Sequence, residues 1–328
     1  MVNILNHGGR LFSKYFSTYG TLLALGIILE AIAGPKPGNV HRYRCHEDKC
    51  IEDYVIAGLI ASNAFIKGAY RGYRIIKYKP KILYMDLVKT IVFNSMRISG
   101  SGNTCLGTAT LITPLSLAIG YVYGKGLEVN LNTLTATARD LVKEYSTCHD
   151  TITYYTILRK IRPSYLKKTD YTGKYPNIYD KSFKKTIIKE NITLWEVLKF
   201  AATKDIVSRE LVDGYKRSID AVHYLENRLS IHKDWNRAII ETYLYLLSKY
   251  IDTIVMLKHG FKMAHYVKSK ALLILETIVK DYQEGLKELE KFDQELQKDR
   301  VNPGAIADLV ALTIGLYSIK KGEKIIHF

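Results

Sequence analysis

The sequence predicts an all-α fold, in which one large multi-helix domain carries a site built from the loops between helices. Apolar residues recur at helical spacing over most of the 328 residues, whereas alternating patterns typical of strands are scarce. Glycine- or proline-bearing turns separate the apolar segments. No linker divides the chain, so we expect a single domain over 1–328 with a motif-bearing core at about 20–320, and two lobes are the alternative.

The N-terminal half contains six apolar segments with helical spacing. They lie at Tyr15–Ile32, Ile51–Tyr73, Leu83–Met96, Thr104–Tyr123, Leu131–Tyr145 and Asp150–Ile161. The run Thr104–Gly124 lacks charged side chains and is long enough to cross a bilayer. Because Pro114 interrupts it and Thr, Ser and Gly are frequent in it, we interpret it as a buried central helix and expect no membrane partner.

An irregular stretch, Pro163–Asp180, separates the halves and is interpreted as a mobile loop over a site or as an insertion. Helices are then expected at Leu194–Leu229, Trp235–Leu257 and Phe261–Gln297, the last increasingly charged and solvent-facing. Asn302-Pro303-Gly304 begins a final apolar helix.

The formal net charge is +16, an excess that attracts nucleic acid, anionic membranes or phosphate-rich small ligands. The basic residues are scattered in short pairs, and no RNA-binding aromatic motif is present, so nucleic acid is not the expected partner. A basic helical protein that binds nucleotide or nucleic acid without catalysis is an alternative.

The four cysteines are too few for a disulfide scaffold of this length. Two of them flank His46 and Asp48, but their spacing matches no common zinc pattern. We therefore interpret the cysteines as incidental and expect a reducing, cytoplasmic location, since the first residues do not read as a signal peptide. The cysteines are Cys45, Cys50, Cys105 and Cys148.

The first glycine-bearing cluster runs from Glu30 to Arg42. Two prolines stiffen the backbone around Lys36, which makes its side chain a candidate phosphate contact. Asn39, His41 and Arg42 follow, so one loop offers amide, imidazole and guanidinium groups. The alternative is a helix-terminating turn with exposed polar residues.

The second cluster, Ser99–Gly107, precedes the apolar helix. A glycine-rich turn at a helix N-terminus presents free N–H groups and the positive end of the helix dipole, which suits phosphate. No Gly-Lys-Ser/Thr follows, so the turn is not a P-loop. Asn103 or Thr104 can also be a simple N-cap.

Four carboxylates complete the candidates. Asp252 and Asp308 lie in apolar helical stretches, and Asp205 and Glu210 stand at near-helical spacing. An acid in apolar surroundings is costly without a cation or a hydrogen-bond donor. Several such acids are what a Mg²⁺–polyphosphate site uses, although each singly also fits an ordinary core or surface acid.

Four motifs together resemble those of the triphosphoribosyl-dephospho-CoA synthases, the CitG/MdcB-type proteins. They are Pro-Lys-Pro-Gly-Asn-Val-His-Arg at 35–42, Gly-Asn-Thr-Cys-Leu-Gly at 102–107, Asp-Thr-Ile-Val-Met-Leu-Lys-His-Gly at 252–260 and Asn-Pro-Gly-Ala-Ile-Ala-Asp-Leu at 302–309. The resemblance implies an all-α fold. It also implies that ATP reacts with 3′-dephospho-CoA to give a triphosphoribosyl conjugate and free adenine.

That reaction needs groups that hold a triphosphate with Mg²⁺ and groups that move protons around an oxocarbenium-like transition state. We expect phosphate or nucleotide contacts from Lys36, Asn39, Arg42, Gly100, Gly102, Asn103, Thr104, Lys258, Asn302 and Gly304. The Mg²⁺ candidates are Asp205, Glu210, Asp252 and Asp308, and the acid–base candidates are His41, His46 and Asp48.

Two segments depart from the family pattern. Many members carry Pro-Gly-Gly-Leu-Gly after a helix that begins with Asp, whereas here the turn after the Asp150 helix reads Pro163-Ser-Tyr-Leu-Lys167. The second cluster has Cys105-Leu106 where the bacterial form has His-Lys. The expected partners are ATP and a CoA-like or other small acceptor, with a homo-oligomer possible. A related ribosyl- or phosphoryl-transferase acting on another cofactor precursor is the alternative function.

Overall fold

The all-α prediction is confirmed by the computed structural model, which describes residues 2–46, 48–170, 172–323 and 326. Within these residues the chain forms fourteen α-helices. They are α1 (Val2–Ile32), α2 (Ile51–Ile75), α3 (Met85–Ser99), α4 (Leu106–Gly124), α5 (Leu131–Tyr145), α6 (Cys148–Ile161), α7 (Phe183–Lys189), α8 (Leu194–Ala201), α9 (Ile206–Val212), α10 (Lys216–His232), α11 (Trp235–Lys249), α12 (Thr253–Lys280), α13 (Tyr282–Lys298) and α14 (Gly304–Lys321).

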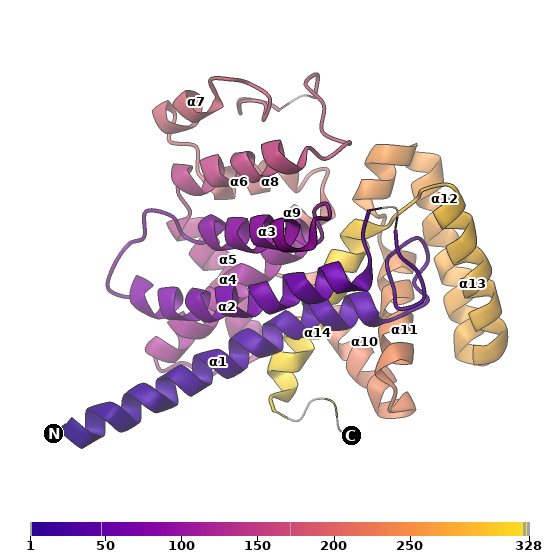
Figure 1. The fold of residues 1–328 in the computed structure, drawn as a ribbon, viewed down its shortest axis with the longest axis horizontal. Coiled ribbons are helices and arrows are strands. Elements are labelled where there is room, and N and C mark those ends of the chain that lie inside the picture. The colour runs from indigo at the N-terminus through magenta and orange to yellow at the C-terminus, as the bar shows by residue number, and fades with distance from the viewer. Residues whose placement is uncertain (1, 47, 171, 324–325, 327–328) are drawn as a thin grey trace.

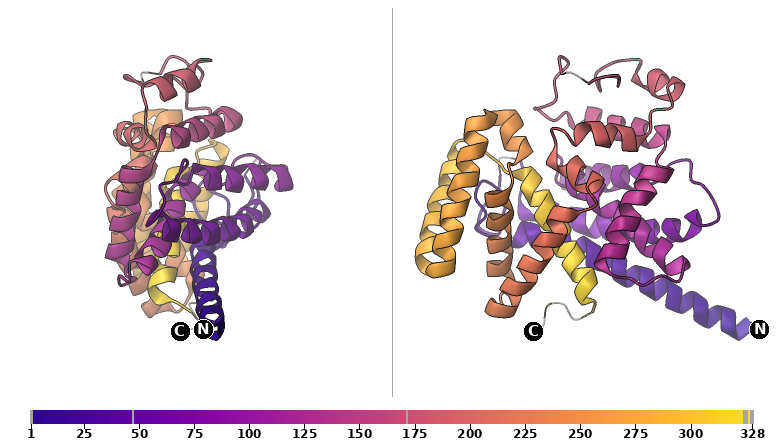
Figure 2. Two further views of the ribbon diagram at one scale, coloured as in Figure 1. Left: turned by 90° about the vertical axis from the view of Figure 1, so that its left-hand side faces the viewer. Right: turned by 180° about the vertical axis from the view of Figure 1, so that it is seen from behind.

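Helix α4 lies at the centre of the N-terminal half, where it packs against α2 and α5 and also contacts α1, α3 and α14. Helix α14 returns to pack along α1, so the two ends of the chain share one core. Helices α12 and α13 form an antiparallel pair at the right of the view in Figure 1, next to α11, and α6–α8 lie at the top. The N-terminal end of α1 projects away from this body (Figure 2).

The apolar sequence of α4 is explained by its burial. Two helices, over Ser13–Ile32 and Leu106–Gly124, are long and apolar enough to cross a membrane. Most of α4 is nevertheless enclosed by its neighbours, as predicted for a central helix. Two of its buried hydroxyls are satisfied within the helix, since Thr110 and Thr113 donate to the carbonyls of Leu106 and Ala109.

Each of the three long helices predicted in the C-terminal half is interrupted in the structure, so their prediction as continuous helices is wrong. The segment Leu194–Leu229 forms three helices, and Phe261–Gln297 breaks at Asp281, whose side chain caps α13. Helix α11 ends at Lys249, and α12 begins after the N-cap Asp252. Hydrophobic periodicity continues across these breaks because both neighbouring helices face the same core. The irregular stretch predicted at Pro163–Asp180 is confirmed in its described residues.

Candidate active site

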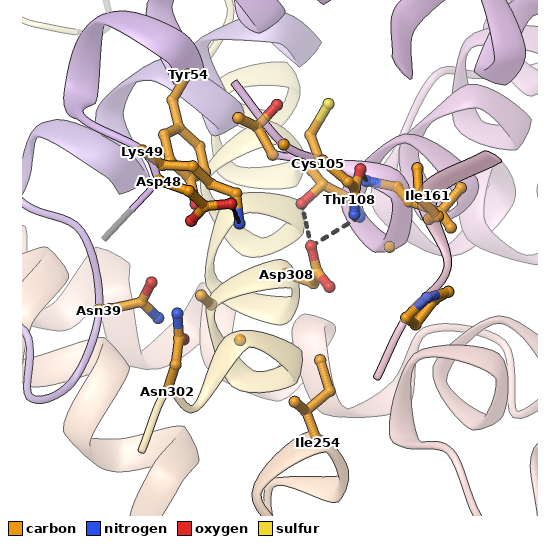
Figure 3. Close-up of a pocket in the computed structure, with 18 of the residues that line it drawn as sticks. Asn39, Asp48, Lys49, Tyr54, Cys105, Thr108, Ile161, Ile254, Asn302 and Asp308 are labelled. Carbon is orange, nitrogen blue, oxygen red and sulfur yellow. Dashed lines mark hydrogen bonds and ion pairs between the residues drawn. The ribbon is translucent and has the colours of Figure 1, made fainter. Parts of the chain in front are cut away.

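A cavity of about 400 Å³ lies where the three glycine-bearing clusters meet. Its walls come from the ends of α1 and α2, the N-terminal ends of α4 and α14, the first turns of α12, and the loop after α6 (Figure 3). Nine of the predicted site residues line it. They are Asn39, Asp48, Gly102, Asn103, Thr104, Lys258, Asn302, Gly304 and Asp308.

Asp308 of α14 contacts the N-terminal end of α4. Its Oδ1 accepts hydrogen bonds from the backbone N–H of Thr108 at 2.8 Å and from the Thr108 hydroxyl at 2.5 Å. Burial raises the pKa of Asp308 to about 7, against the opposing effect of the two Thr108 bonds. Since both bonds end on Oδ1, Oδ2 of Asp308 is the oxygen available to a cation.

In the second cluster, side chains already bind some of the N–H groups that the sequence analysis offers to phosphate. Asn103 accepts from the N–H of Leu106 at 3.1 Å, and Asp308 takes the N–H of Thr108, so an amide and a carboxylate occupy positions that the sequence offers to phosphate. Gly102 and Thr104 line the cavity, whereas Gly100 does not. Gly100 instead ends α3, where its φ is 75°. Phosphate binding by this turn stays a prediction.

The loop between α1 and α2 brings Asp48 and Lys49 into the cavity. Cys45 and Cys50 form a disulfide across this tip, which corrects the interpretation of both cysteines as incidental. The Lys49 ammonium lies 3.4 Å from Oδ2 of Asp48. His46 does not line the cavity but stands beside it, with Nδ1 3.7 Å from Oδ1 of Asp48.

Lys36 does not reach the cavity, so its predicted contact with a phosphate there is wrong. Its side chain is fully buried, and the ammonium donates to the backbone carbonyl and to Oε1 of Glu30. An ammonium excluded from water needs such a partner, which is why the lysine turns inward. Glu30, which the sequence left without a role, lines the cavity in its place.

His41 and Arg42 also lie outside the cavity wall and hold the first loop in position. The buried His41 bonds through Nε2 to Oδ2 of Asp293 on α13 at 3.2 Å, and the N–H of Gly38 donates to the same carboxylate at 3.0 Å. The exposed Arg42 donates to the carbonyl of Ile32 at 2.9 Å. Direct contact of either side chain with a ligand in this cavity is therefore not supported.

Three of the four predicted magnesium ligands have other partners. Asp205 caps α9, and its Oδ2 accepts from the N–H of Ser208 at 2.9 Å. Glu210 is buried against Arg217, with an N···O distance of 3.2 Å. Asp252 caps α12 and accepts from Ile306 N at 2.8 Å, while burial raises its pKa to about 6.

These partners explain why acids stand in apolar helical sequence. Of the four predicted magnesium ligands, only Asp308 lines the cavity. The described residues also contain no group of three or more His, Cys, Asp or Glu side chains arranged to hold a metal. Magnesium commonly binds through one or two carboxylates and completes its shell with phosphates and water. Asp308 fits that mode, since Gly107 leaves room for its carboxylate where a β-carbon would overlap Oδ2.

Several cavity residues escaped the sequence prediction. Tyr54 of α2 and Tyr165 of the loop after α6 both face the acids of the cavity, and burial raises the pKa of each phenol. Cys105 also lines the wall, and burial raises its pKa to about 12, so the thiol stays protonated near neutral pH. Tyr165 belongs to the turn that departs from the family pattern, which was the one available signal.

The cavity has three cations among its lining residues, namely Lys49, Arg162 and Lys258. Partial burial lowers the pKa of Lys258, and the nearby charge of Lys49 lowers it further. The two ammonium groups are thus close enough to repel each other, an arrangement that an anionic ligand relieves. Arg162 and Lys49 were not predicted.

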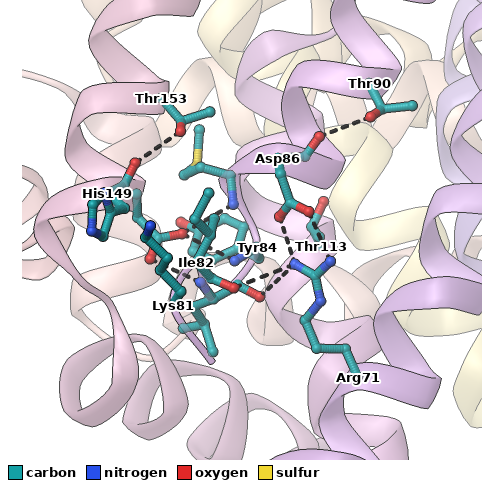
Figure 4. A network of polar contacts seen from close by, with 12 residues as sticks. Arg71, Lys81, Ile82, Tyr84, Asp86, Thr90, Thr113, His149 and Thr153 are labelled. Atoms are coloured by element: carbon teal, nitrogen blue, oxygen red, sulfur yellow. Dashed lines mark hydrogen bonds and ion pairs between the residues drawn. The ribbon is translucent and has the colours of Figure 1, made fainter. Parts of the chain in front are cut away.

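Arg162 owes its position to the anchoring of α6. Asp150, near the N-terminus of α6, accepts from the N–H groups of Leu83 and Tyr84 at 2.9 and 3.0 Å and so joins α6 to the start of α3. Arg71 of α2 binds Asp86 of α3 and braces the same junction (Figure 4). The far end of α6 then carries Arg162 and the following residues to the cavity wall.

Two buried oxygens in the wall lack a protein partner. The side-chain Oδ1 of Asn302 and the hydroxyl of Thr104 make no hydrogen bond within the described residues. Figure 3 shows Asn302 and Asn39 pointing toward each other across one end of the cavity. Unpaired polar atoms at a cavity wall are typical of groups that meet a ligand or water.

Comparison with known proteins agrees with this geometry. Residues 16–326 match the family model CitG, described as ATP:dephospho-CoA triphosphoribosyl transferase. A 2-(5″-triphosphoribosyl)-3′-dephosphocoenzyme-A synthase of Escherichia fergusonii is 34% identical over 92 residues, which are 28% of this chain and 30% of that protein. The match thus spans less than a third of that relative.

The fold also has a counterpart among solved structures. The crystal structure of a provisionally assigned triphosphoribosyl-dephospho-CoA synthase from Archaeoglobus fulgidus superposes with a TM-score of 0.55 at 26% identity. The superposition covers 80% of this chain and 100% of that chain. Together with the family match over 16–326, these similarities show that the chain belongs to the CitG family.

Proposed function

We propose that this protein transfers the triphosphoribosyl group of ATP to the 2′-hydroxyl of 3′-dephospho-CoA and releases adenine. The main support is that residues of all four family motifs line one cavity, which also holds three cations and three carboxylates. The family description names the same reaction. The product would be 2′-(5″-triphosphoribosyl)-3′-dephospho-CoA.

In this proposal Lys49, Arg162 and Lys258 bind the triphosphate, because they are the cations of the cavity and the donor must be retained with all its phosphates. Asp308 would hold Mg²⁺ through Oδ2, with phosphate oxygens and water as the other ligands. When bound, the ion supplies charge neutralisation of the triphosphate. Thr108 keeps Asp308 in the required orientation.

The chemistry breaks the bond between the ribosyl anomeric carbon and N9 of adenine and forms a bond from that carbon to the acceptor oxygen. The acceptor hydroxyl must lose a proton, and the departing adenine must gain one. We assign one of these transfers to Asp48, which lines the cavity with His46 beside it.

The direct test incubates the purified protein with ATP, Mg²⁺ and 3′-dephospho-CoA and follows adenine and the conjugate by chromatography. We expect adenine release that requires both the acceptor and Mg²⁺. Adenine release without the acceptor would contradict the transferase and indicate a nucleosidase. Formation of ADP or AMP without adenine would instead indicate phosphoryl transfer.

A different acceptor is the second candidate, because Pro163, Ser164 and Tyr165 of the divergent turn line the cavity. A panel of ribose-bearing cofactor precursors in the same assay separates it from dephospho-CoA. A non-catalytic nucleic-acid binder, which the net charge also allows, would instead bind oligonucleotides with a steep loss of affinity at higher salt.

A further inference from the structure

The geometry points to Glu30 as a second proton-transfer residue of the cavity, with Lys36 as the residue that positions it. Glu30 would accept the proton of the attacking hydroxyl. This inference rests on the function proposed above and deepens it. Neither residue has this role in the sequence analysis, where Lys36 is a phosphate contact.

Glu30 lies in the last turn of α1 and is one of the cavity-lining residues, although its side chain is only 6% exposed. The ammonium of Lys36 bonds to the backbone carbonyl and to Oε1 of this same residue. The contact with the carbonyl holds the ammonium in place, and the contact with Oε1 fixes one side of the carboxylate. Its other oxygen, Oε2, is the atom available to a ligand in the cavity.

The location of the pair argues against a purely structural role. Burying two charges costs hydration free energy, and the attraction between them commonly offsets only part of that cost. A buried ion pair is therefore weak evidence that the pair stabilises the fold. The chain has another buried acid with cationic partners, Glu241 with Arg228 and Arg237, and Glu241 does not line the cavity. Glu30 differs from Glu241 in lining the cavity.

The surroundings of Glu30 act on its pKa in opposite directions. Burial raises the pKa of Glu30 and lowers that of Lys36, because both groups lose water. The titratable groups that face Glu30 are Lys36, His41, Tyr54, Tyr243 and Asp308. Lys36 is the one that binds it directly, and it favours the carboxylate form that a base needs.

The step balances without a further reactant. The O–H bond of the acceptor breaks, and its proton goes to Oε2 of Glu30. The oxygen electron pair forms the bond to the anomeric carbon as the carbon–N9 bond breaks. The N9 electron pair leaves with adenine, which takes a proton from Asp48 or from water.

Glu30→Gln tests the role, because the amide oxygen can still accept from Lys36 but the group cannot take the proton. We expect kcat for adenine release to fall about 10²- to 10⁴-fold, the range typical of general acid–base residues, with the Kd for ATP within about twofold of wild type. Glu241→Gln is the matched control, since it removes a buried, paired carboxylate away from the cavity. It should lower the melting temperature and leave kcat within about threefold.

Lys36→Met separates positioning from structure. Without the ammonium the pKa of Glu30 should rise further, so the acidic limb of the kcat–pH profile should move upward by about one pH unit or more. If the Glu30→Gln variant fails to fold, the double variant Glu30→Gln with Lys36→Met replaces it in the test. The double variant removes both charges of the pair, so neither is left buried without a partner. Unchanged kcat in a folded Glu30 variant, or an unmoved limb in Lys36→Met, overturns the inference while leaving the transferase intact. Absence of wild-type turnover overturns both.

Discussion

Gly107 of α4 faces the carboxylate of Asp308 on α14 so closely that a β-carbon at position 107 would overlap Oδ2. The two residues are 201 positions apart along the chain, and their approach joins the second family motif to the last one. The same approach lets Thr108 bind Oδ1 with both its N–H and its hydroxyl. The last glycine of the second cluster thus makes room for an acid.

Gly107→Ala should therefore strongly reduce turnover without unfolding the protein. The methyl group would displace the Asp308 carboxylate from Thr108 and from the cation position, so we expect kcat/KM to fall at least about 100-fold. Circular dichroism and the melting temperature check the fold, and calorimetry checks Mg²⁺-dependent ATP binding, which should weaken in parallel. Wild-type Mg²⁺ dependence in this variant would remove Asp308 from the metal role.

Asp308 also predicts how stability depends on pH in the absence of ligands. Its pKa is about 7 in the folded chain against 3.8 for an ordinary aspartate. Between about pH 4 and pH 7 the unfolded state therefore binds fewer protons, so folding stability falls as pH rises, by at most about 1.4 kcal/mol per pH unit from this group. Asp252, whose pKa is about 6, contributes in the same direction.

Asp308→Asn removes the titration while keeping an acceptor for Thr108. We expect the variant and the wild type to melt alike near pH 4, and the variant to become progressively more stable than wild type up to about pH 7. Denaturant unfolding across this range is the measurement. A wild type that gains stability relative to the variant as pH rises would show that the carboxylate is ionised at low pH.

The hydrogen bonds of the buried acids show what the sequence could not predict. Helical spacing predicts the all-α fold, because that signal is local. The glycine-bearing turns, the isolated acids and the family resemblance together predict nine residues of the cavity. They cannot tell a capping acid from a metal ligand. Asp205 and Asp252 lie in the pattern expected of metal ligands, but both accept hydrogen bonds from backbone N–H groups. The donor to Asp252 is Ile306 of α14, which lies far along the chain.

Lys36 and Glu30 illustrate a second limit of the sequence prediction. A lysine between two prolines reads as an exposed cation, and its inward turn depends on a partner six residues earlier whose burial is set by tertiary packing. Lys49 and Arg162 were missed for the opposite reason. Each sits in an unremarkable local sequence and reaches the cavity only through the path of its loop.

The Cys45–Cys50 disulfide predicts a contribution to substrate binding. It closes the short loop tip that presents Asp48 and Lys49 to the cavity. Cys45→Ser with Cys50→Ser should raise the KM for ATP several-fold, because the tip becomes more mobile, while the melting temperature falls by only a few degrees. Cys148→Ser, which changes a cysteine outside this loop, is the control. An unchanged KM in the double variant would show that the tip holds its position without the bond.

Lys258 and Lys262 give a matched pair for testing the triphosphate contact. Both are exposed lysines of α12 on either side of the non-helical Gly260, but only Lys258 lines the cavity. Lys258→Gln should weaken ATP binding about 10-fold or more, and AMP binding much less, since Lys258 binds the triphosphate in the proposed function and AMP carries a single phosphate. Lys262→Gln should leave both affinities near wild type. Equal losses in the two variants would mean that ATP responds to the overall positive field of the protein and not to a contact at Lys258.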